Sequence, residues 1–403
     1  MSRIFTRERF GRPQILAGLM LLGFLVECGW LAGHERRMDT GAADAELARI
    51  EEGVEQWRGG AIAGTPAANT SREMLQPTAG RFDPRHSPLW YLIGAAPVAV
   101  LRISPESWTW VWLTRAPYIL IGALLGASVW YVARRLYGNA GGYIALGLYC
   151  SSPTVIRSSA LWFSPPHIAA VWGAFGAVFT GVAVSHTLYA PREVVLWNWR
   201  RIVLLGIALG LAIGSQFSMA IVVPALVVLM LYLAPERKAA AMAILAFACG
   251  IAVLILLASY FFHPTIFWHG LMHARWTDWT SRALAMPGAY LQAASEISES
   301  GPVLALMLPV GLITFAVWKR SRYFGNGAPL GMAAVLILLR VASPHEAVSV
   351  FSLAAAVFLF VFVSGMAADL LETRAHEAIL ALTVALVVAN AAWNLIGLGR
   401  IAR

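Results

Sequence analysis

Apolar residues form long uninterrupted runs along this chain, and short basic or polar connections separate them. The runs lie at about 14–33, 111–133, 139–156, 165–187, 202–217, 218–234, 239–262, 301–318, 327–342, 348–368 and 376–398. About 20 apolar residues are the length that a helix needs to cross a bilayer. The pattern therefore predicts an all-α, polytopic integral membrane protein with about eleven transmembrane helices, built as a single membrane domain over residues 1–403.

Two of the expected spans, 202–217 and 218–234, are short and directly adjacent. Basic residues bound the pair on both sides, at 200–201 and 237–238, which indicates an even number of crossings. The sequence Gly-Ser-Gln at 214–216 provides a place for the chain to turn between them.

Positively charged clusters predict which span ends face the cytoplasm. With a cytoplasmic N-terminus and an uncleaved signal anchor at 14–33, every basic cluster falls on the cytoplasmic side; the clusters are 134–135, 192–201, 237–238, 319–322 and Arg374. This agreement requires the apolar segment 88–107 to be juxtamembrane. We therefore expect a multi-pass protein of the plasma (inner) membrane with two large extracytoplasmic loops, 34–110 and 263–300.

The composition supports this reading and excludes several classes of protein. The 403 residues are 59% hydrophobic and 13% charged, whereas soluble domains carry about 25% charged residues. A soluble enzyme and a nucleic-acid-binding domain are thereby excluded, and the net charge of +9 fits cytoplasmic loops and the headgroups of membrane lipids. Three cysteines, all in apolar runs, support neither a disulfide framework nor a metal site, and we expect no cofactor.

An amphipathic helix is predicted inside the first outer loop. Its apolar residues recur at three- and four-residue spacing between glutamates; they are Leu47, Ile50, Val54 and Trp57. Gly59 and Gly60 are expected to end the helix.

Ionisable residues cluster in the same loop. They are Asp39, Asp44, Glu46, Asp83, Arg85 and His86. A carboxylate at a membrane surface accepts a proton from an attacking hydroxyl or amine, while Arg and His hold a phosphate leaving group. The combination favours group transfer from a lipid-linked phosphate, and the alternative is a solvated acidic helix followed by an interfacial loop.

Several motifs stand in a fixed order. Asp44-Ala45-Glu46 opens the amphipathic helix; residues 82–91 read Phe-Asp-Pro-Arg-His-Ser-Pro-Leu-Trp-Tyr; Arg115-Ala116-Pro117 opens a span that ends in Arg-Arg-Leu-Tyr-Gly at 134–138. A late Ser-Pro-His-Glu at 343–346 is a weaker fourth motif. In this order the motifs resemble those of the GT-C glycosyltransferases, especially the branch of the protein O-mannosyltransferases and the lipid A aminoarabinose transferase. The resemblance covers about residues 14–240 and is mainly topological beyond.

The resemblance implies a GT-C-like fold and an inverting, metal-independent glycosyltransferase. The donor would be a polyprenyl-phosphate-linked sugar, and the acceptor a lipid, glycan or protein on the extracytoplasmic face. Asp44 matches the catalytic base, with Asp39 as the substitute, and Asp83 matches the acidic residue of the aromatic segment. The residues that match the donor phosphate site are Arg85, His86 and Arg115. Ala45 splits the acidic pair of the family motif, and Ser87 replaces the first proline of a Pro-Pro pair.

We expect the two large outer loops to cover an outward-facing cavity, and further ionisable residues are expected to line it. They are Glu46, Arg157, His167, His269, His273 and His345. His269 and His273 share a helix face, but without the glutamate of a metalloprotease motif an aromatic-rich interfacial helix explains them better.

Two other functions remain open at this point. A flippase or transporter of lipid-linked intermediates would be expected to show internal repeats and charges midway along several spans, whereas the charges here lie mostly at span ends. A non-catalytic protein on the same fold is the second alternative, and Ala45 in the acidic pair is the observation that suggests it.

Overall fold

A computed structural model describes residues 13–34, 41–60, 82–105, 107–161, 167–189, 199–277, 279–343 and 350–401. Every regular element in these ranges is helical. The longer helices are α2 (Pro13–His34), α3 (Gly41–Trp57), α4 (Leu89–Leu101), α5 (Trp108–Cys150), α7 (Ile168–Thr187), α9 (Trp199–Ser215), α10 (Val222–Leu233), α11 (Lys238–Ser259), α13 (Pro287–Glu299), α14 (Pro302–Val317), α15 (Phe324–Ala342), α16 (Val350–Leu370) and α17 (His376–Ile401). Shorter helices are α6 (Pro153–Ala160), η3 (Phe217–Ile221), α12 (Pro264–His273), η4 (Ser281–Ala285) and η5 (Lys319–Ser321).

The all-α, membrane-spanning architecture predicted from the sequence is confirmed. Seven described helices are long and apolar enough to cross a membrane, or up to eight if the bent pair α13 and α14 forms one span. The expected number of about eleven is not confirmed, because several expected spans are short helices: α9 has 17 residues, α14 has 16 and α10 has 12. At a rise of 1.5 Å per residue, α10 covers only about 18 Å of a hydrocarbon core that is about 30 Å thick.

A glycine divides the longest helix into the two segments expected there. Gly138 in α5 has φ 76° and ψ −172°, a backbone conformation that is essentially restricted to glycine. Arg134 and Arg135 lie four and three residues before this kink, so the basic pair occupies the last turn of the first segment.

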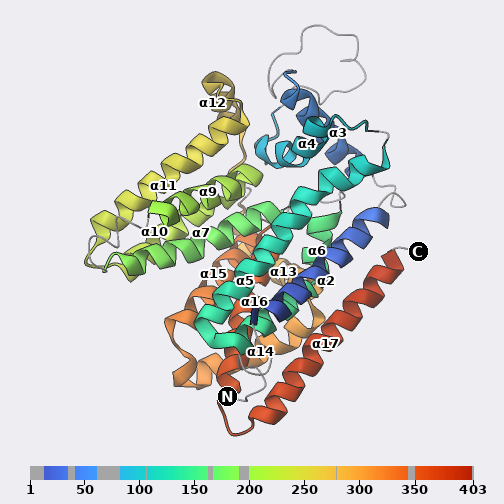
Figure 1. Ribbon diagram of the computed structural model, residues 1–403. Helices are drawn as coiled ribbons and strands as arrows, with labels where there is room; N and C mark the ends of the chain where they lie inside the picture. The colour runs from blue at the N-terminus through green and yellow to red at the C-terminus, as the bar shows by residue number, and fades with distance from the viewer. Residues whose placement is uncertain are drawn as a thin grey trace. The chain divides into compact units, whose positions relative to one another are not determined.

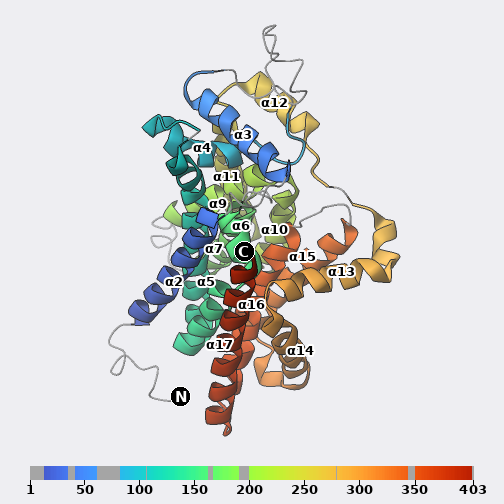
Figure 2. The ribbon, with the colours of Figure 1, turned by 90° about the vertical axis from the view of Figure 1, so that its right-hand side faces the viewer.

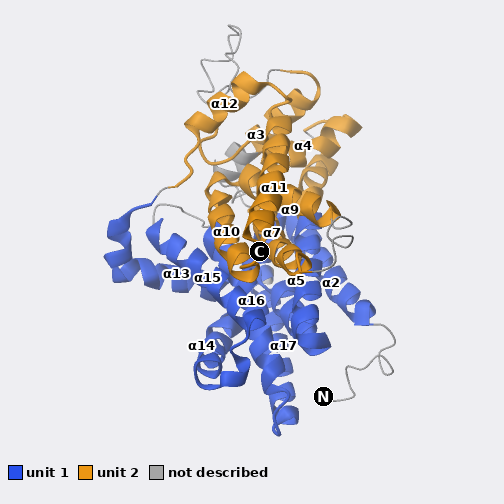
Figure 3. Ribbon diagram, turned by 90° about the vertical axis from the view of Figure 1, so that its left-hand side faces the viewer, with its two compact units in different colours: residues 1–39, 119–161, 278–403 blue, residues 40–118, 162–277 orange. Residues whose placement is uncertain are grey.

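The described chain packs as two compact units (Figure 3). Unit 1 comprises residues 1–39, 119–161 and 278–403, and unit 2 comprises residues 40–118 and 162–277. Helices that meet the criteria for a membrane span occur in both, for example α16 in unit 1 and α11 in unit 2. The division therefore does not separate a membrane part from a soluble part.

In unit 2, helices α7, α9, α10 and α11 lie side by side (Figures 1 and 2). Small residues allow α7 and α9 to approach closely: a Cβ on Gly173 would lie 2.5 Å from the backbone oxygen of Ala208 and 2.5 Å from the backbone nitrogen of Ala212. Such small-residue interfaces are typical of helices in membranes.

The amphipathic helix of the first loop is confirmed as α3. It packs on α4, with Ile50 and Val54 buried against Trp90 and its neighbours. Gly59 has φ 86°, and the Gly60 N–H donates to the carbonyl of Glu55 at 2.8 Å. This is the glycine-dependent helix end expected from the sequence.

In unit 1, α16 is the central helix and is buried over nearly its whole length. Helices α13, α14, α15 and α17 pack around it. Hydrogen-bonded polar side chains link three helices of this bundle. Arg340 of α15 donates to both carboxylate oxygens of Glu296 in α13, and Ser352 of α16 donates to the same carboxylate.

Candidate functional site

A tight turn at residues 83–86 organises the charged segment of the first loop. The Asp83 carboxylate accepts the backbone N–H of Arg85 at 2.8 Å and that of His86 at 3.2 Å on one oxygen. Its other oxygen lies 3.0 Å from Nδ1 of His86. Asp side chains commonly cap the backbone two or three residues ahead in this way, so the motif sequence itself forms the turn.

The pairing fixes the charge of Asp83. Burial would raise the pKa of its carboxyl, but the positive charge and hydrogen bond of His86, the Arg85 N–H and the charge of Arg49 lower the pKa from its ordinary value of 3.8 to about 2. Asp83 is therefore ionised at neutral pH and is a weak proton acceptor. Its geometry is suited to orienting the His86 ring with Nδ1 toward the carboxylate and Nε2 away from it.

Aromatic and histidine rings surround this turn. The His86 ring is buried, with its centroid 5.6 Å from Trp90 and 6.4 Å from His167 at the start of α7. On the other side, Phe82 stacks on His273 of α12 at 5.6 Å and 19°. Thus His86, His167 and His273 gather around one turn.

Backbone hydrogen bonds join the turn to two distant segments. The Ser87 N–H and Oγ–H both donate to the carbonyl of Gly214, at 3.1 and 2.8 Å, at the end of α9. The Phe217 N–H donates to the Arg85 carbonyl at 2.9 Å, and the Arg275 N–H donates to the Pro84 carbonyl at 2.6 Å. The helix is interrupted where the sequence predicts a turn, since α9 ends at Ser215 and Gln216 is extended, and this segment is also part of the site.

Three side chains of the segment 215–218 carry buried polar atoms. Ser215 Oγ, Gln216 Oε1 and Ser218 Oγ have no hydrogen-bond partner among the residues that the structure describes. Buried polar groups are nearly always hydrogen-bonded, so these atoms are suited to binding a polar ligand or water. The sequence pattern indicates only a turn at residues 214–216.

Helix α3 adds two charged residues that the sequence analysis also missed as site residues. Arg49 and Glu52 form an ion pair at 3.2 Å, and the positive charge of Arg49 helps to lower the pKa of Asp83. Burial raises the pKa of the Glu52 carboxyl; Arg49 opposes this shift, and the negative charges of Glu55 and Asp83 add to it. The three- and four-residue spacing of Arg49, Glu52 and Gln56 along one helix face was the available signal.

Three other predicted site residues lie on elements other than the turn: Arg115, His269 and Arg157. Arg115 is fully buried in the first segment of α5, within unit 2. His269 and His273 are exposed on α12, where the His273 ring nitrogen contacts the His269 carbonyl at 2.7 Å. Arg157 belongs to α6 in unit 1 and lines a cavity there.

Four predicted site residues lie wholly or in their side chains outside the described part of the chain. Asp39 and His345 lie outside the described residues, and Asp44 and Glu46 lie in α3 with only their backbone described. Within the described ranges, no group of three or more His, Cys, Asp or Glu side chains has a metal-binding arrangement.

Comparisons with known proteins identify the fold. No family model and no curated protein match the sequence. Among solved structures, the chain is similar to ArnT from Cupriavidus metallidurans bound to undecaprenyl phosphate, with a TM-score of 0.60 and 13% identity over 93% of this chain and 63% of that chain. It is also similar to the archaeal oligosaccharyltransferase AglB from Archaeoglobus fulgidus in complex with an inhibitory peptide and a dolichol-phosphate, with a TM-score of 0.55 and 12% identity over 94% of this chain and 55% of that chain.

Both solved proteins are members of the GT-C superfamily, and the predicted GT-C-like fold is confirmed. The apo form of ArnT matches with a TM-score of 0.55 and 15% identity, over 83% of this chain and 57% of that chain. The chain thus spans about three fifths of the length of these proteins. At such identities the likeness concerns the fold.

Proposed function

We propose that this chain is a membrane glycosyltransferase that transfers a sugar from a polyprenyl-phosphate-linked donor to an acceptor on the extracytoplasmic face. The observation that carries the proposal is the turn at 83–86 on the GT-C-like fold, where an ionised carboxylate holds the buried His86 next to Arg85 in the sequence. We further propose that the protein lies in the plasma (inner) membrane with a cytoplasmic N-terminus, so that this turn faces outward. The acceptor would be a lipid, glycan or protein.

In the proposed mechanism, Asp44 accepts the proton of an acceptor hydroxyl as its oxygen attacks the anomeric carbon. The bond from that carbon to the phosphate oxygen breaks with inversion, and polyprenyl phosphate leaves with the bonding electrons. Arg85, His86 and Arg115 stabilise the charge on the phosphate, since charge-assisted hydrogen bonds are stronger than neutral ones. Asp83 serves this step indirectly, because it holds Nδ1 of His86 and so orients the ring that interacts with the phosphate.

The segment 215–218 would bind the polar head of the donor. Gln216 and the two neighbouring serines have buried oxygens without described partners, and backbone hydrogen bonds fix this segment against the turn. Hydroxyl groups of a sugar donate hydrogen bonds to such oxygens. We expect Gln216→Leu to weaken donor binding more than it lowers the rate of sugar transfer once the donor is bound.

The experiment is a transfer assay with purified protein and a polyprenyl phosphate sugar. Asp44→Asn retains size and hydrogen bonding but cannot accept a proton, so transfer is expected to fall roughly 10²–10⁴-fold while donor binding barely changes. Arg85→Ala removes a cation that contacts phosphate in the ground and transition states, so donor affinity and rate should both decrease. Glu51→Gln, which removes an exposed charge of α3, is the matched control.

Equal activity of Asp44→Asn and wild type would remove Asp44 from the mechanism, and Asp39→Asn would then be tested as the substitute base. If neither variant reduces transfer, the base assignment fails. Donor binding without any transfer would reject the enzyme and support a flippase or a non-catalytic protein.

A further inference from the structure

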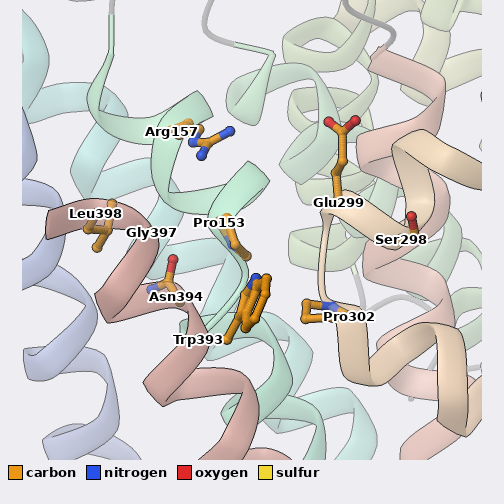
Figure 4. Close-up of a pocket in the computed structure, with 9 residues that line it drawn as sticks. All are labelled: Pro153, Arg157, Ser298, Glu299, Pro302, Trp393, Asn394, Gly397 and Leu398. Atoms are coloured by element: carbon orange, nitrogen blue, oxygen red, sulfur yellow. The ribbon is translucent and has the colours of Figure 1, made fainter. Parts of the chain in front are cut away.

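A cavity of about 330 Å³ lies in unit 1, and none of the residues used in the proposed mechanism lines it. Helices α6, α13, α14 and α17 supply its walls (Figure 4). The lining residues are Pro153, Arg157, Ser298, Glu299, Pro302, Trp393, Asn394, Gly397 and Leu398.

Hydrogen bonds between helices fix the frame of this cavity. The Thr154 hydroxyl donates to Ser300 Oγ at 2.9 Å and joins α6 to the end of α13. On α17, the Asn390 amide donates to Ser151 Oγ at 2.9 Å and to its carbonyl at 3.2 Å. The cavity is therefore built on fixed junctions between helices, which is a property of binding sites.

The cavity presents opposite charges on facing sides. Figure 4 shows Arg157 and Glu299 across the opening from each other, with Trp393 between them and below. Neither charge has an ion-pair partner among the described residues, and Arg157 Nε is buried without a hydrogen bond. Asn394 is 1% exposed; its amide donates to Glu27 at 3.1 Å, and its Oδ1 has no partner in the described part of the chain.

Two helices also begin at this cavity. Pro153 is the first residue of α6 and Pro302 the first residue of α14. The partial positive charge of helix N-termini adds to that of Arg157 and favours an anion on this side. Glu299 favours a cation on the facing side.

The position along α17 indicates a membrane interface. Trp393 is 17 residues beyond the start of α17 at His376, which at 1.5 Å per residue is about 26 Å, close to the thickness of the hydrocarbon core. Trp393 is 62% exposed, and Leu395 and Ile396 beside it are also exposed. Tryptophan is enriched at this depth, so the cavity opens where lipid headgroups meet acyl chains.

We propose that this cavity binds the headgroup of a zwitterionic phospholipid with a primary ammonium, of the phosphatidylethanolamine type. The phosphate binds at Arg157 and the two helix N-termini, and the ammonium donates to Glu299 and Ser298. The acyl chains run along the exposed apolar face of α17. A sugar ring has no charges to pair with Arg157 and Glu299 and would not use the lipid-facing opening.

The test compares the full-length protein in nanodiscs that contain phosphatidylethanolamine, phosphatidylglycerol or phosphatidylcholine, with native mass spectrometry of the retained lipids. Wild type is expected to retain phosphatidylethanolamine in preference to the other two. Arg157→Gln should weaken retention of both phosphatidylethanolamine and phosphatidylglycerol by about tenfold, since it removes the phosphate ligand. Glu299→Gln should weaken phosphatidylethanolamine retention and strengthen that of phosphatidylglycerol, since it removes the ammonium ligand and the repulsion of an anion.

Matched controls are Arg282→Gln and Glu377→Gln, which remove exposed charges outside the cavity. The opposite response of the two lipids to Glu299→Gln is the decisive readout, because a folding defect would lower both. Lipid retention that neither variant alters would overturn the proposal. Binding of a water-soluble sugar phosphate without lipid, or equal effects of the control variants, would overturn it as well.

Discussion

The Asp83–His86 pair makes a quantitative prediction about the stability of the candidate site. The Asp83 side chain is 19% exposed and its pKa is lowered from 3.8 to about 2. Each pKa unit corresponds to 1.36 kcal/mol, so the ionised carboxylate stabilises the local structure by about 2 kcal/mol. In Asp83→Asn the side-chain oxygen still accepts the two backbone N–H groups, but the charge is lost. We therefore expect a roughly thirtyfold increase in local opening at neutral pH.

Amide hydrogen exchange measures this opening directly. The Ser87 N–H and the Phe217 N–H both bond across the junction between the turn and the end of α9, so their protection reports whether the junction is closed. In Asp83→Asn both amides should exchange faster by this factor, whereas amides of α16 should not change. Glu51→Gln is the control, since it removes the same charge from an exposed position.

The pH dependence has a defined sign. Because the folded-state pKa of Asp83 is below its ordinary value, the stabilisation is fully present above about pH 4 and is lost as the pH falls from about 4 to about 2. Protection of the Ser87 amide, corrected for intrinsic exchange, should decrease over this interval in wild type and stay constant in Asp83→Asn. Unchanged exchange in the variant at neutral pH, or a parallel pH profile in both proteins, would refute the reasoning.

Three further changes test the fold around the site. Gly173→Ala would place a methyl group 2.5 Å from the backbone oxygen of Ala208 and should destabilise the α7–α9 contact by about 1–3 kcal/mol; Gly176→Ala, with its nearest contact at 3.5 Å, should leave the melting temperature unchanged. Arg340→Met leaves the Glu296 carboxylate, which is 20% exposed, without its buried cation and should cost about 1–3 kcal/mol in thermal unfolding; a melting temperature equal to that of wild type would show that the pair is not needed. Asn69→Cys should react with an impermeant thiol reagent added to intact cells, because residues 34–110 are predicted to be extracytoplasmic; labelling only after lysis would invert the topology.

Much of the helical framework could be predicted from the sequence because it depends on local pattern. Apolar runs predict the positions of the helices. Gly59 and Gly138 predict two helix ends, since the backbone at both positions has a positive φ that other residues rarely adopt. The number of full crossings could not be predicted, because a helix such as α10 is apolar enough for a span and yet too short. Length after packing depends on neighbouring helices, which a single sequence does not specify.

The candidate site shows the same division between local and long-range information. The turn at 83–86 is local and could be inferred from Asp83 and the residues that follow it. The contribution of Gln216 could not, because it depends on hydrogen bonds between segments more than 120 residues apart in sequence, such as Ser87 and Gly214. Arg49 and Glu52 were visible in the helical pattern, but only the packing of α3 shows that they act on Asp83.

Ser87 illustrates how a departure from a family motif acquires a structural role. The resembled motif has proline at this position, and proline has no backbone N–H to donate. Ser87 instead donates both its N–H and its hydroxyl to the Gly214 carbonyl, and its hydroxyl oxygen accepts the Leu89 N–H at 3.2 Å at the start of α4. The substitution therefore connects the turn at 83–86, the end of α9 and the start of α4 through one fully buried residue. In physical terms the departure strengthens the connection of this turn to the helices around it, which is why we retain the turn as the centre of the proposed active site.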